Sequence, residues 1–364
     1  MTVGYYAPLP PARTGVADYA ATLLAALRER GPVNVNASHA DVFLYHLGNN
    51  QLHGEIYRRA LDRPGVVVLH DAVLQHFFLG SLSEEKYIEE FVFNYGEWHR
   101  DLARALWRNR ALSGGDPRYF AYPMLRRIAE ASRAVVVHNP AAARMVREHA
   151  PSARVIEIPL LFAPPEMPPE AESVRMRAQW GVGQRSFLFG VLGYLREPKR
   201  IATILRAFET VRRFCPGAML LIAGDCESRH LQRILPRSGA GILRLPYLEG
   251  NKFWSSAMAV DACINLRYPA AGESSAIATG MMGIGKPVLV TAGEETSAYP
   301  ETGCVRIEAG LAEQASLTEH SVLLGMYPQL AREIGARAAE HIRREHSLDR
   351  VADEYWKVLQ VAVN

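Results

Sequence analysis

The sequence contains few lysines, few cysteines and no long apolar run. Only five of its 364 residues are lysines, so the basic charge comes almost entirely from arginine. The four cysteines, at positions 215, 226, 263 and 304, form no Cys-x-x-Cys pair and no zinc-ligand spacing. This pattern argues against a zinc site and suits a reducing compartment. No apolar stretch reaches the roughly 18 residues that a membrane-spanning helix needs.

The composition also excludes a disordered chain, because hydrophobic residues make up 49% of the sequence and the net charge is only +3. So small a net charge gives little support for a nucleic-acid partner, which requires a concentrated basic face. The first six residues show no basic segment followed by an apolar one, so we expect no signal peptide and a cytoplasmic protein. At roughly 100–200 residues per domain, the length predicts two or three domains.

Short apolar runs alternate with segments of helical length. The runs predict buried strands at Val42–Tyr45, Val66–Leu69, Ala134–Val137, Phe187–Leu192, Met219–Ala223, Ala262–Leu266 and Pro287–Val290. Helices are expected between many of them, for example at Ala17–Arg30, Ile201–Arg213 and Ser275–Gly283. Such alternation predicts βαβ units and parallel sheets covered on both faces. Five prolines between residues 159 and 169 predict a linker between two α/β halves.

The segment from about residue 84 to 131 is expected to be a helical insertion. Its apolar residues recur at helical spacing, at Phe91, Tyr95, Trp98, Leu102 and Leu106. Arginines 100, 104 and 108 form a second, basic stripe. This stripe either meets an anionic acceptor or a membrane face, or is the solvated side of an ordinary surface helix, and the second interpretation is favoured. A last helix is expected to start at Ser347.

Two glycine-containing loops are typical of phosphate binding. Thr14 and Gly15 follow a proline-rich loop and open a helix whose N-terminus can attract phosphate oxygens, although an ordinary turn capped by Thr14 has the same sequence. Gly193 follows a predicted strand, and Arg196 and Lys199 come just after it. Two cations in a loop at the carboxyl end of a parallel strand suit a diphosphate, and the alternative is a pair of exposed charges before a helix.

A third loop joins Gly272, Glu273, Ser274 and Ser275. Glu273 can bind a ribose diol, and the amides after it can bind phosphate at the start of a helix. The alternative is that Glu273 is a helix-capping acid. The following Gly-Lys-Pro at 285–287 is not part of a P-loop, because the required order of glycine, lysine and serine or threonine is missing.

Polar residues follow three of the predicted strands of the first half. They are Gly48 and Asn49 (with His53 a little later), His70 and Asp71, and His138 and Asn139. A single histidine is more often structural than catalytic. Three such groups on parallel strands should converge on one edge of the sheet, and His70 is the foremost catalytic candidate.

Taken together, these motifs resemble the GT-B glycosyltransferases, specifically the retaining group called family 4, over nearly the whole chain. The resemblance implies two Rossmann-like α/β domains that face each other across a cleft. The N-terminal acceptor-binding domain would comprise residues 1–162 and 347–364, with the insertion at about 84–131. The nucleotide-sugar-binding domain would comprise residues 163–346. The closing helix, with Val351, Tyr355 and Leu359, is similar to the helix that crosses back onto the N-terminal domain in this family.

The resemblance also implies a function. The chain would transfer a sugar, with retention of configuration, from a nucleoside-diphosphate sugar to a saccharide, lipid-linked or other small acceptor, without a cofactor or metal and without nucleic acid. Peripheral contact with a membrane stays open. His70, Glu273, Lys199 and Arg196 would be catalytic. The ligand-binding set would be Gly15, Asn49, Asp71, His138, Gly193, Arg196, Lys199, Gly272, Glu273, Ser274 and Ser275.

The sequence departs from the family at two places. The usual second glutamate is replaced by Met281, or by Gly280 if the Gly-Lys-Pro motif is aligned, and the usual arginine after the loop glycine is Tyr194. Two alternatives therefore stay open: a nucleotide-sugar 2-epimerase-like enzyme, and a non-catalytic binding protein on the same fold. A phosphorylase-like enzyme would need a Schiff-base lysine, for which no lysine has an evident setting. A nicotinamide enzyme would need a Gly-x-Gly-x-x-Gly turn, which is missing.

Overall fold

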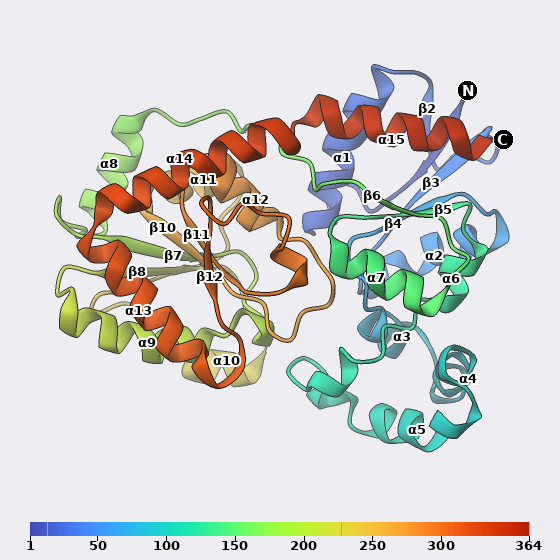
Figure 1. Ribbon diagram of the computed structural model, residues 1–364, viewed down its shortest axis with the longest axis horizontal. Helices are drawn as coiled ribbons and strands as arrows, with labels where there is room; N and C mark the ends of the chain where they lie inside the picture. Colours follow the sequence, from blue (N-terminus) through green and yellow to red (C-terminus); the bar gives the residue numbers. More distant parts are fainter. Residues whose placement is uncertain (13, 227, 364) are drawn as a thin grey trace. The chain divides into compact units, whose positions relative to one another are not determined.

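The computed structural model describes residues 1–12, 14–226 and 228–363, so Arg13 in the first loop lies outside the described residues. The chain divides into two compact units (Figure 1). Unit 1 comprises Met1–Ala163, Pro269–Ser274 and His346–Asn364, and unit 2 comprises Pro164–Tyr268 and Ser275–Glu345. Ala163 and His346, which the expected domains assign to the second half, cluster with unit 1. Residues 269–274, which carry the Gly-Glu-Ser motif, cluster with unit 1 and not with the second half.

Unit 1 is built on a six-stranded parallel sheet with the strand order β2-β1-β3-β4-β5-β6. Its strands are β1 (Val3–Tyr6), β2 (Val33–Val35), β3 (Val42–Leu47), β4 (Val66–Leu69), β5 (Ala134–Val137) and β6 (Val155–Glu157). Its helices are α1 (Gly15–Arg28), α2 (Gly54–Asp62), α3 (Gln75–Ser81), α4 (Glu84–Tyr95), α5 (Arg100–Arg108), α6 (Arg126–Ala131), α7 (Pro140–His149) and α15 (Leu348–Val363). Strands β4 and β5 are buried over their whole length, and β3 is buried at every residue except Phe43, as expected for a sheet covered on both faces.

Alternate residues of each strand build two separate hydrophobic cores, because successive side chains point to opposite faces of a sheet. On β4, for example, Val67 and Leu69 pack with α2 to α7, whereas Val66 and Val68 pack with α1 and α15. Helix α15 is therefore part of unit 1. The phenol oxygens of Tyr355 on α15 and Tyr19 on α1 lie 3.0 Å apart in the buried interface between the two helices.

The helical insertion is present but is not one continuous stripe. Gly96, with φ +86°, ends α4, and a short 3-10 turn (η2, Glu97–His99) precedes α5. The prediction that Trp98 shares the buried stripe is wrong, because the break turns it outward and leaves it 98% exposed. Arg100 pairs with Glu97, and Arg104 pairs with Asp101 at 3.0 Å, as on a solvated helix face. No described helix is both long enough and apolar enough to cross a membrane.

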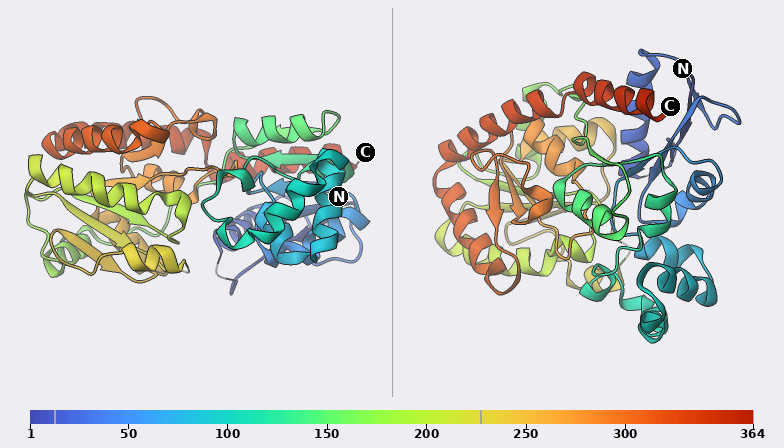
Figure 2. Two further views of the ribbon diagram at one scale, coloured as in Figure 1. Left: turned by 90° about the horizontal axis from the view of Figure 1, so that it is seen from below. Right: turned by 45° about the vertical axis from the view of Figure 1, so that its right-hand side comes forward.

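Unit 2 contains a second six-stranded parallel sheet with the order β12-β11-β10-β7-β8-β9. Its strands are β7 (Leu188–Leu192), β8 (Met219–Ala223), β9 (Ile242–Leu245), β10 (Ala262–Asn265), β11 (Val288–Thr291) and β12 (Val305–Ile307). Its helices are α8 (Glu170–Gln179), α9 (Ile201–Phe214), α10 (Arg229–Ile234), α11 (Gly250–Ala259), α12 (Ala276–Gly283), α13 (Glu313–Met326) and α14 (Pro328–Glu345). Helices cover both faces of this sheet (Figure 2).

The strands predicted from apolar runs are all present, and their ends differ from the predicted ones by at most two residues. The sheet order places β7 in the middle of unit 2, beside β8 and β10, and β4 in the middle of unit 1, beside β3 and β5. All these strands are parallel, so the loops at their carboxyl ends meet at one edge of each sheet. Those two edges carry the candidate residues.

Candidate functional site

The polar groups after β3, β4 and β5 come together at the edge of the first sheet, as predicted. The Asp71 carboxylate accepts a hydrogen bond from the backbone N–H of Asn49 at 2.8 Å, and this bond joins the ends of β3 and β4. The Asn49 side chain in turn accepts from the Phe77 amide at 2.9 Å and so holds the start of α3. Asn49 and Asp71 therefore shape this edge through contacts within the protein.

His70 lies at this edge in a cluster of aromatic side chains. Its Nε2 is 3.0 Å from Nδ1 of His46, which lies on β3 and was not predicted to take part. The His138 ring is centred 5.2 Å from the His70 ring, and the Tyr19 ring meets His70 edge-on at 4.9 Å. His138 donates from Nδ1 to the Ile158 carbonyl at 2.9 Å.

Burial keeps these imidazoles uncharged. It lowers the pKa of His46 to about 3 and that of His138 to about 4. The pKa of His70 also lies well below its ordinary value, first through burial and then through the neighbouring histidines. Each imidazolium would lose hydration and repel the others. At neutral pH, His70 can therefore form hydrogen bonds with a ligand without carrying a charge.

The segment Pro269–Ser274 packs on the same edge of unit 1. The Ala72 amide, after β4, donates to the Ala271 carbonyl at 2.8 Å. The Asn139 side-chain amide, after β5, donates to the Gly272 carbonyl at 2.9 Å and to the Ser274 hydroxyl oxygen at 3.0 Å. Gly272 has φ +67°, and a Cβ there would lie only 2.7 Å from the Ala72 Cβ. A glycine is thus required for this close approach.

These contacts bring the glutamate loop to the polar residues that follow β4 and β5. Ser274 donates from its hydroxyl to the His138 carbonyl at 3.1 Å, and Glu273 accepts from the Ala271 amide at 2.6 Å. The predicted ribose-binding and sugar-binding residues are therefore in one place, on unit 1. Asn139 makes this connection, whereas from the sequence it was expected only as a polar residue at the end of a strand. Ser275 belongs to unit 2, where its hydroxyl accepts from the Ala278 amide and caps α12.

Gly15 is the first residue of α1, and Thr14 caps the helix by accepting from the Ala17 amide at 3.1 Å. Gly15 is exposed, and a Cβ built on it would meet nothing within 4 Å. Packing within the described chain thus does not require a glycine at this position. One turn further along α1 is Tyr19, which contacts His70. The open helix N-terminus therefore belongs to the same edge of unit 1.

In unit 2, the predicted cations Arg196 and Lys199 lie in the loop that follows the carboxyl end of β7. Lys199 is only 4% exposed, and its ammonium donates to the Leu192 carbonyl at the end of β7. Burial, and then the charges of Arg267 and Arg196, hold the pKa of Lys199 well below its ordinary value. Arg267 follows β10 and was not predicted from the sequence. Three basic side chains thus lie at the carboxyl ends of β7 and β10.

The loop that carries Lys199 is fixed from both ends. Gly193 has φ +81°, and a Cβ on Gly224 would clash with the Gly193 carbonyl, so the loops after β7 and β8 touch through bare backbone. At the other end, Arg200 donates from Nε to both carboxylate oxygens of Glu313, at 3.0 and 2.7 Å. Glu313 is 2% exposed. This ion pair, in which one N–H is shared between both oxygens of a buried carboxylate, helps to hold the lysine loop in place.

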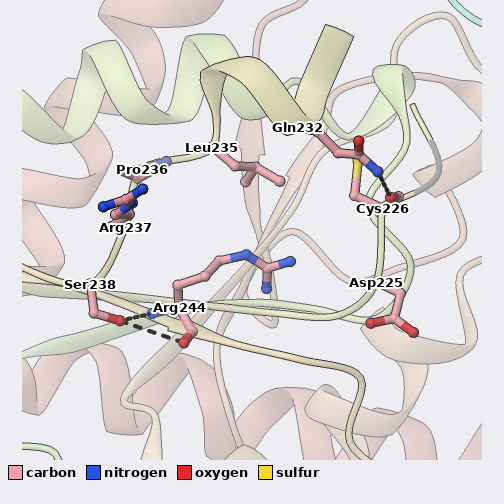
Figure 3. Close-up of a pocket in the computed structure, with 8 residues that line it drawn as sticks. All are labelled: Asp225, Cys226, Gln232, Leu235, Pro236, Arg237, Ser238 and Arg244. Atoms are coloured by element: carbon pink, nitrogen blue, oxygen red, sulfur yellow. Dashed lines mark hydrogen bonds between the residues drawn. The ribbon is translucent and has the colours of Figure 1, made fainter. Parts of the chain in front are cut away.

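Tyr194 and Tyr247 form a half-buried ring pair next to Gly193, with centroids 5.7 Å apart. Asp225, after β8, joins their loops: its carbonyl accepts from the Leu195 amide at 2.9 Å, and its carboxylate accepts from the Tyr247 amide at 3.2 Å. Asp225 also lines an open pocket of about 560 Å³ (Figure 3). Arg244 crosses this pocket and donates to the Ile222 carbonyl at 3.0 Å and to the Gly224 carbonyl at 2.5 Å.

The other lysine of the sequence motifs has a structural role. Lys286 donates to the Met258 carbonyl at 2.8 Å, near the end of α11. Among the described residues, no group of three or more histidine, cysteine, aspartate or glutamate side chains is placed to hold a metal ion.

The fold has clear relatives among solved structures. Sucrose-phosphate synthase from Thermosynechococcus elongatus superimposes with a TM-score of 0.71 at 14% identity, over 99% of each chain. HepE from Anabaena, in complex with UDP and glucose, gives a TM-score of 0.69 at 13% identity, over 99% of this chain and 100% of HepE. The catalytic domain of starch synthase IV from Arabidopsis thaliana, bound to ADP and acarbose, gives 0.63 at 11% identity, over 100% and 99%.

The fold is GT-B. At these identities the likeness establishes the architecture alone, which is the one that the sequence predicted. No protein-family model matches the sequence, and no curated protein sequence matches it. In this GT-B chain, the roles of the individual site residues must therefore be argued from their chemistry.

Proposed function

We propose that this chain is a glycosyltransferase, which moves a sugar from a nucleoside-diphosphate sugar to a saccharide or another small acceptor with retention of configuration. The observation that carries the proposal is the set of basic groups in unit 2. Lys199, Arg196 and Arg267 lie at the carboxyl ends of two neighbouring strands, and the lysine pKa is depressed first by burial and then by repulsion from the two arginines. A diphosphate placed there would relieve that repulsion and restore the lysine charge.

Cations at this position would stabilise the leaving group. When the bond between the sugar and the diphosphate breaks, negative charge develops on the diphosphate, and fixed positive groups lower the energy of that transition state. Lys199 would act as a buried ammonium, and Arg196 and Arg267 as guanidinium groups suited to phosphate oxygens. The half-buried rings of Tyr194 and Tyr247 offer an apolar surface for the nucleobase. Two of the structural relatives bind UDP with glucose and ADP with acarbose, respectively.

The edge of unit 1 supplies groups suited to a neutral sugar. His70 would donate a hydrogen bond to the transferred sugar, and Glu273 would accept from the ribose hydroxyls. Asn49, Asp71 and His138 would hold this edge in shape. The N-terminus of α1 at Gly15 and the amides around Ser274 and Ser275 would attract phosphate oxygens.

Binding of nucleoside diphosphates tests the proposal. UDP, GDP or ADP should raise the melting temperature, and Lys199→Met should weaken the affinity for the best of them by roughly 10–100-fold, the value of a charge-assisted hydrogen bond. Lys286→Met is the matched control, because Lys286 is half-buried and also donates to a backbone carbonyl. We expect it to leave nucleotide affinity unchanged. Failure of every nucleoside diphosphate to bind would contradict the proposal.

Inorganic pyrophosphate separates the phosphate and base contacts. Tyr194→Leu should weaken UDP binding and leave pyrophosphate binding unchanged, whereas Lys199→Met should weaken both. An equal loss of affinity for UDP and for pyrophosphate in Tyr194→Leu would contradict a contact between the nucleobase and this ring pair.

Turnover tests the chemistry. Mass spectrometry should detect transfer to an acceptor or slow hydrolysis of the nucleotide sugar, and NMR of the product should show the same anomer as in the donor. Nucleotide binding without either reaction would favour a non-catalytic binding protein, and an inverted anomer would contradict retention.

A further inference from the structure

We propose that His46 is a positioning residue: it fixes the tautomer of His70, so that His70 presents Nδ1–H as a hydrogen-bond donor to the transferred sugar. The inference rests on the proposed function for the identity of the ligand, but the tautomer itself is a property of the free chain. It assigns a role to a residue on β3 that would otherwise be an ordinary core side chain.

The geometry makes the two histidines one unit. Nδ1 of His46 and Nε2 of His70 are 3.0 Å apart, and the rings are nearly parallel, with an angle of 19° and centroids 5.2 Å apart. His46 is 0% exposed, and His70 is 9% exposed. One proton must lie between the two facing nitrogens, because two lone pairs or two N–H groups at this distance would repel each other. Each neutral imidazole carries a proton on only one of its two nitrogens, so one ring donates and the other accepts.

The environment of His46 decides which ring carries that proton. Nε2 of His46 is sealed from solvent and has no hydrogen-bond partner. If His70 donated the shared proton, His46 would have to carry its own proton on Nε2, as a buried N–H without an acceptor. A buried unpaired N–H is rarer and costlier than an unpaired acceptor. His46 therefore carries its proton on Nδ1 and donates it to Nε2 of His70.

The tautomer of His70 follows. Since its Nε2 accepts, its proton must be on Nδ1. Nε2 of His46, of His53 and of His138 is sealed from solvent and has no hydrogen-bond partner. Nδ1 of His70 is not sealed in this way. Nδ1 is thus the nitrogen of His70 that a ligand can reach. The groups around the pair are His53, His138, Tyr5 and Tyr19, none of which is a carboxylate that would favour an imidazolium.

The consequence for the reaction is a choice between two roles. A lone pair on Nδ1 would let His70 act as a base, whereas an N–H there donates to an oxygen. A hydroxyl oxygen of the sugar accepts such a bond, and so does an oxygen that gains negative charge in the transition state. His46 thus selects donation over proton abstraction.

The experiment reads the tautomer directly, in the ligand-free full-length chain with ¹⁵N-labelled histidine. The ¹⁵N NMR shifts of His70 should show a protonated Nδ1 and an unprotonated Nε2 at pH 7. His46→Phe keeps a ring but removes the donor, and should release His70 to a mixture of tautomers. His46→Asn keeps an amide donor close to the Nδ1 position and should restore Nδ1–H. A wild-type His70 protonated on Nε2 would overturn the inference.

Kinetics provide the second readout, with whichever of UDP-, GDP- or ADP-glucose the wild-type chain hydrolyses. His46→Phe should lower kcat about tenfold, the value of one hydrogen bond, with the affinity for the nucleoside diphosphate unchanged. His46→Asn should recover most of the rate. His53→Asn is the matched control: His53 is equally buried but donates to the His46 carbonyl, not to the His70 ring. We expect it to leave the His70 tautomer and kcat unchanged.

The two proposals can fail separately. A chain that binds no nucleoside diphosphate refutes the proposed function, and the NMR measurement still decides the tautomer. A wild-type kcat in His46→Phe, or an equal loss in His53→Asn and His46→Phe, overturns the positioning role even where the nucleotide binds. If His46→Phe does not fold, the wild-type spectrum and His46→Asn decide the question.

Discussion

Substitution of Gly272 by alanine tests whether residues 269–274 lie on the strand ends of unit 1. The new methyl carbon would be 2.7 Å from the Ala72 Cβ and 3.2 Å from the Met145 sulfur, although carbon atoms prefer about 3.5–4.0 Å. The φ of +67° adds about 1–2 kcal/mol for any residue other than glycine. Relief of the contact would strain the packing or break the bonds to Ala72 and Asn139, at a cost of about 1–3 kcal/mol.

We therefore expect Gly272→Ala to lower the free energy of unfolding by about 2–5 kcal/mol, measured by urea denaturation. Gly181→Ala is the control. Gly181 has φ +70°, and a Cβ there would meet nothing within 4 Å, so only the backbone cost of about 1–2 kcal/mol applies. The rate of nucleotide-sugar hydrolysis should fall in Gly272→Ala and not in Gly181→Ala. Equal stability of the two variants would refute the close packing of residues 269–274 on the strand ends of unit 1.

Three further predictions concern buried polar groups. Because burial lowers the pKa of His46 to about 3, from 6.5 in the unfolded chain, stability should fall as the pH drops from about 6.5 toward 3, by about 2 kcal/mol at pH 5 for this histidine. His46→Asn should flatten that dependence in acid titrations followed by circular dichroism. The lowered pKa of Lys199 means that folding opposes its protonation, so Lys199→Met should stabilise the ligand-free chain at neutral pH, and urea denaturation should show the gain vanish as the pH approaches 10.5. Tyr355→Phe, which leaves the Tyr19 hydroxyl without this partner, should cost about 1–2 kcal/mol in thermal denaturation; an unchanged melting temperature would contradict a role of this contact in docking α15.

The sequence predicted the architecture because its signals are local and redundant. Each central strand is an apolar run that ends at a polar residue, and the spacing of Val351, Tyr355 and Leu359 marks the buried face of α15. The missed strands are short or at the margins of the sheets: β2, β6 and β12 have three residues each, and β9, at the edge of its sheet, has four. A run of three residues is too short to show an alternating pattern.

The site was predicted less completely, because its decisive contacts join residues far apart in the chain. His46 was overlooked although it follows a predicted strand by one residue, since its importance comes from its distance to His70. Asn139 holds a loop more than 130 positions later, which no spacing rule shows. Lys199 was expected to face a ligand as a simple cation, and only the structure shows that it is buried with its ammonium on a backbone carbonyl.

The two sheet edges differ in charge, and the difference suits the proposed reaction. The edge of unit 2 concentrates Lys199, Arg196 and Arg267, whereas the edge of unit 1 presents imidazoles whose charge is suppressed by burial. In a sugar transfer, the diphosphate gains negative charge and requires fixed cations. The hydroxyl groups of the sugar are neutral, and an uncharged imidazole can hydrogen-bond to them. A buried cluster that keeps His70 neutral and leaves it an N–H to donate suits a sugar hydroxyl, just as the fixed cations of unit 2 suit a diphosphate.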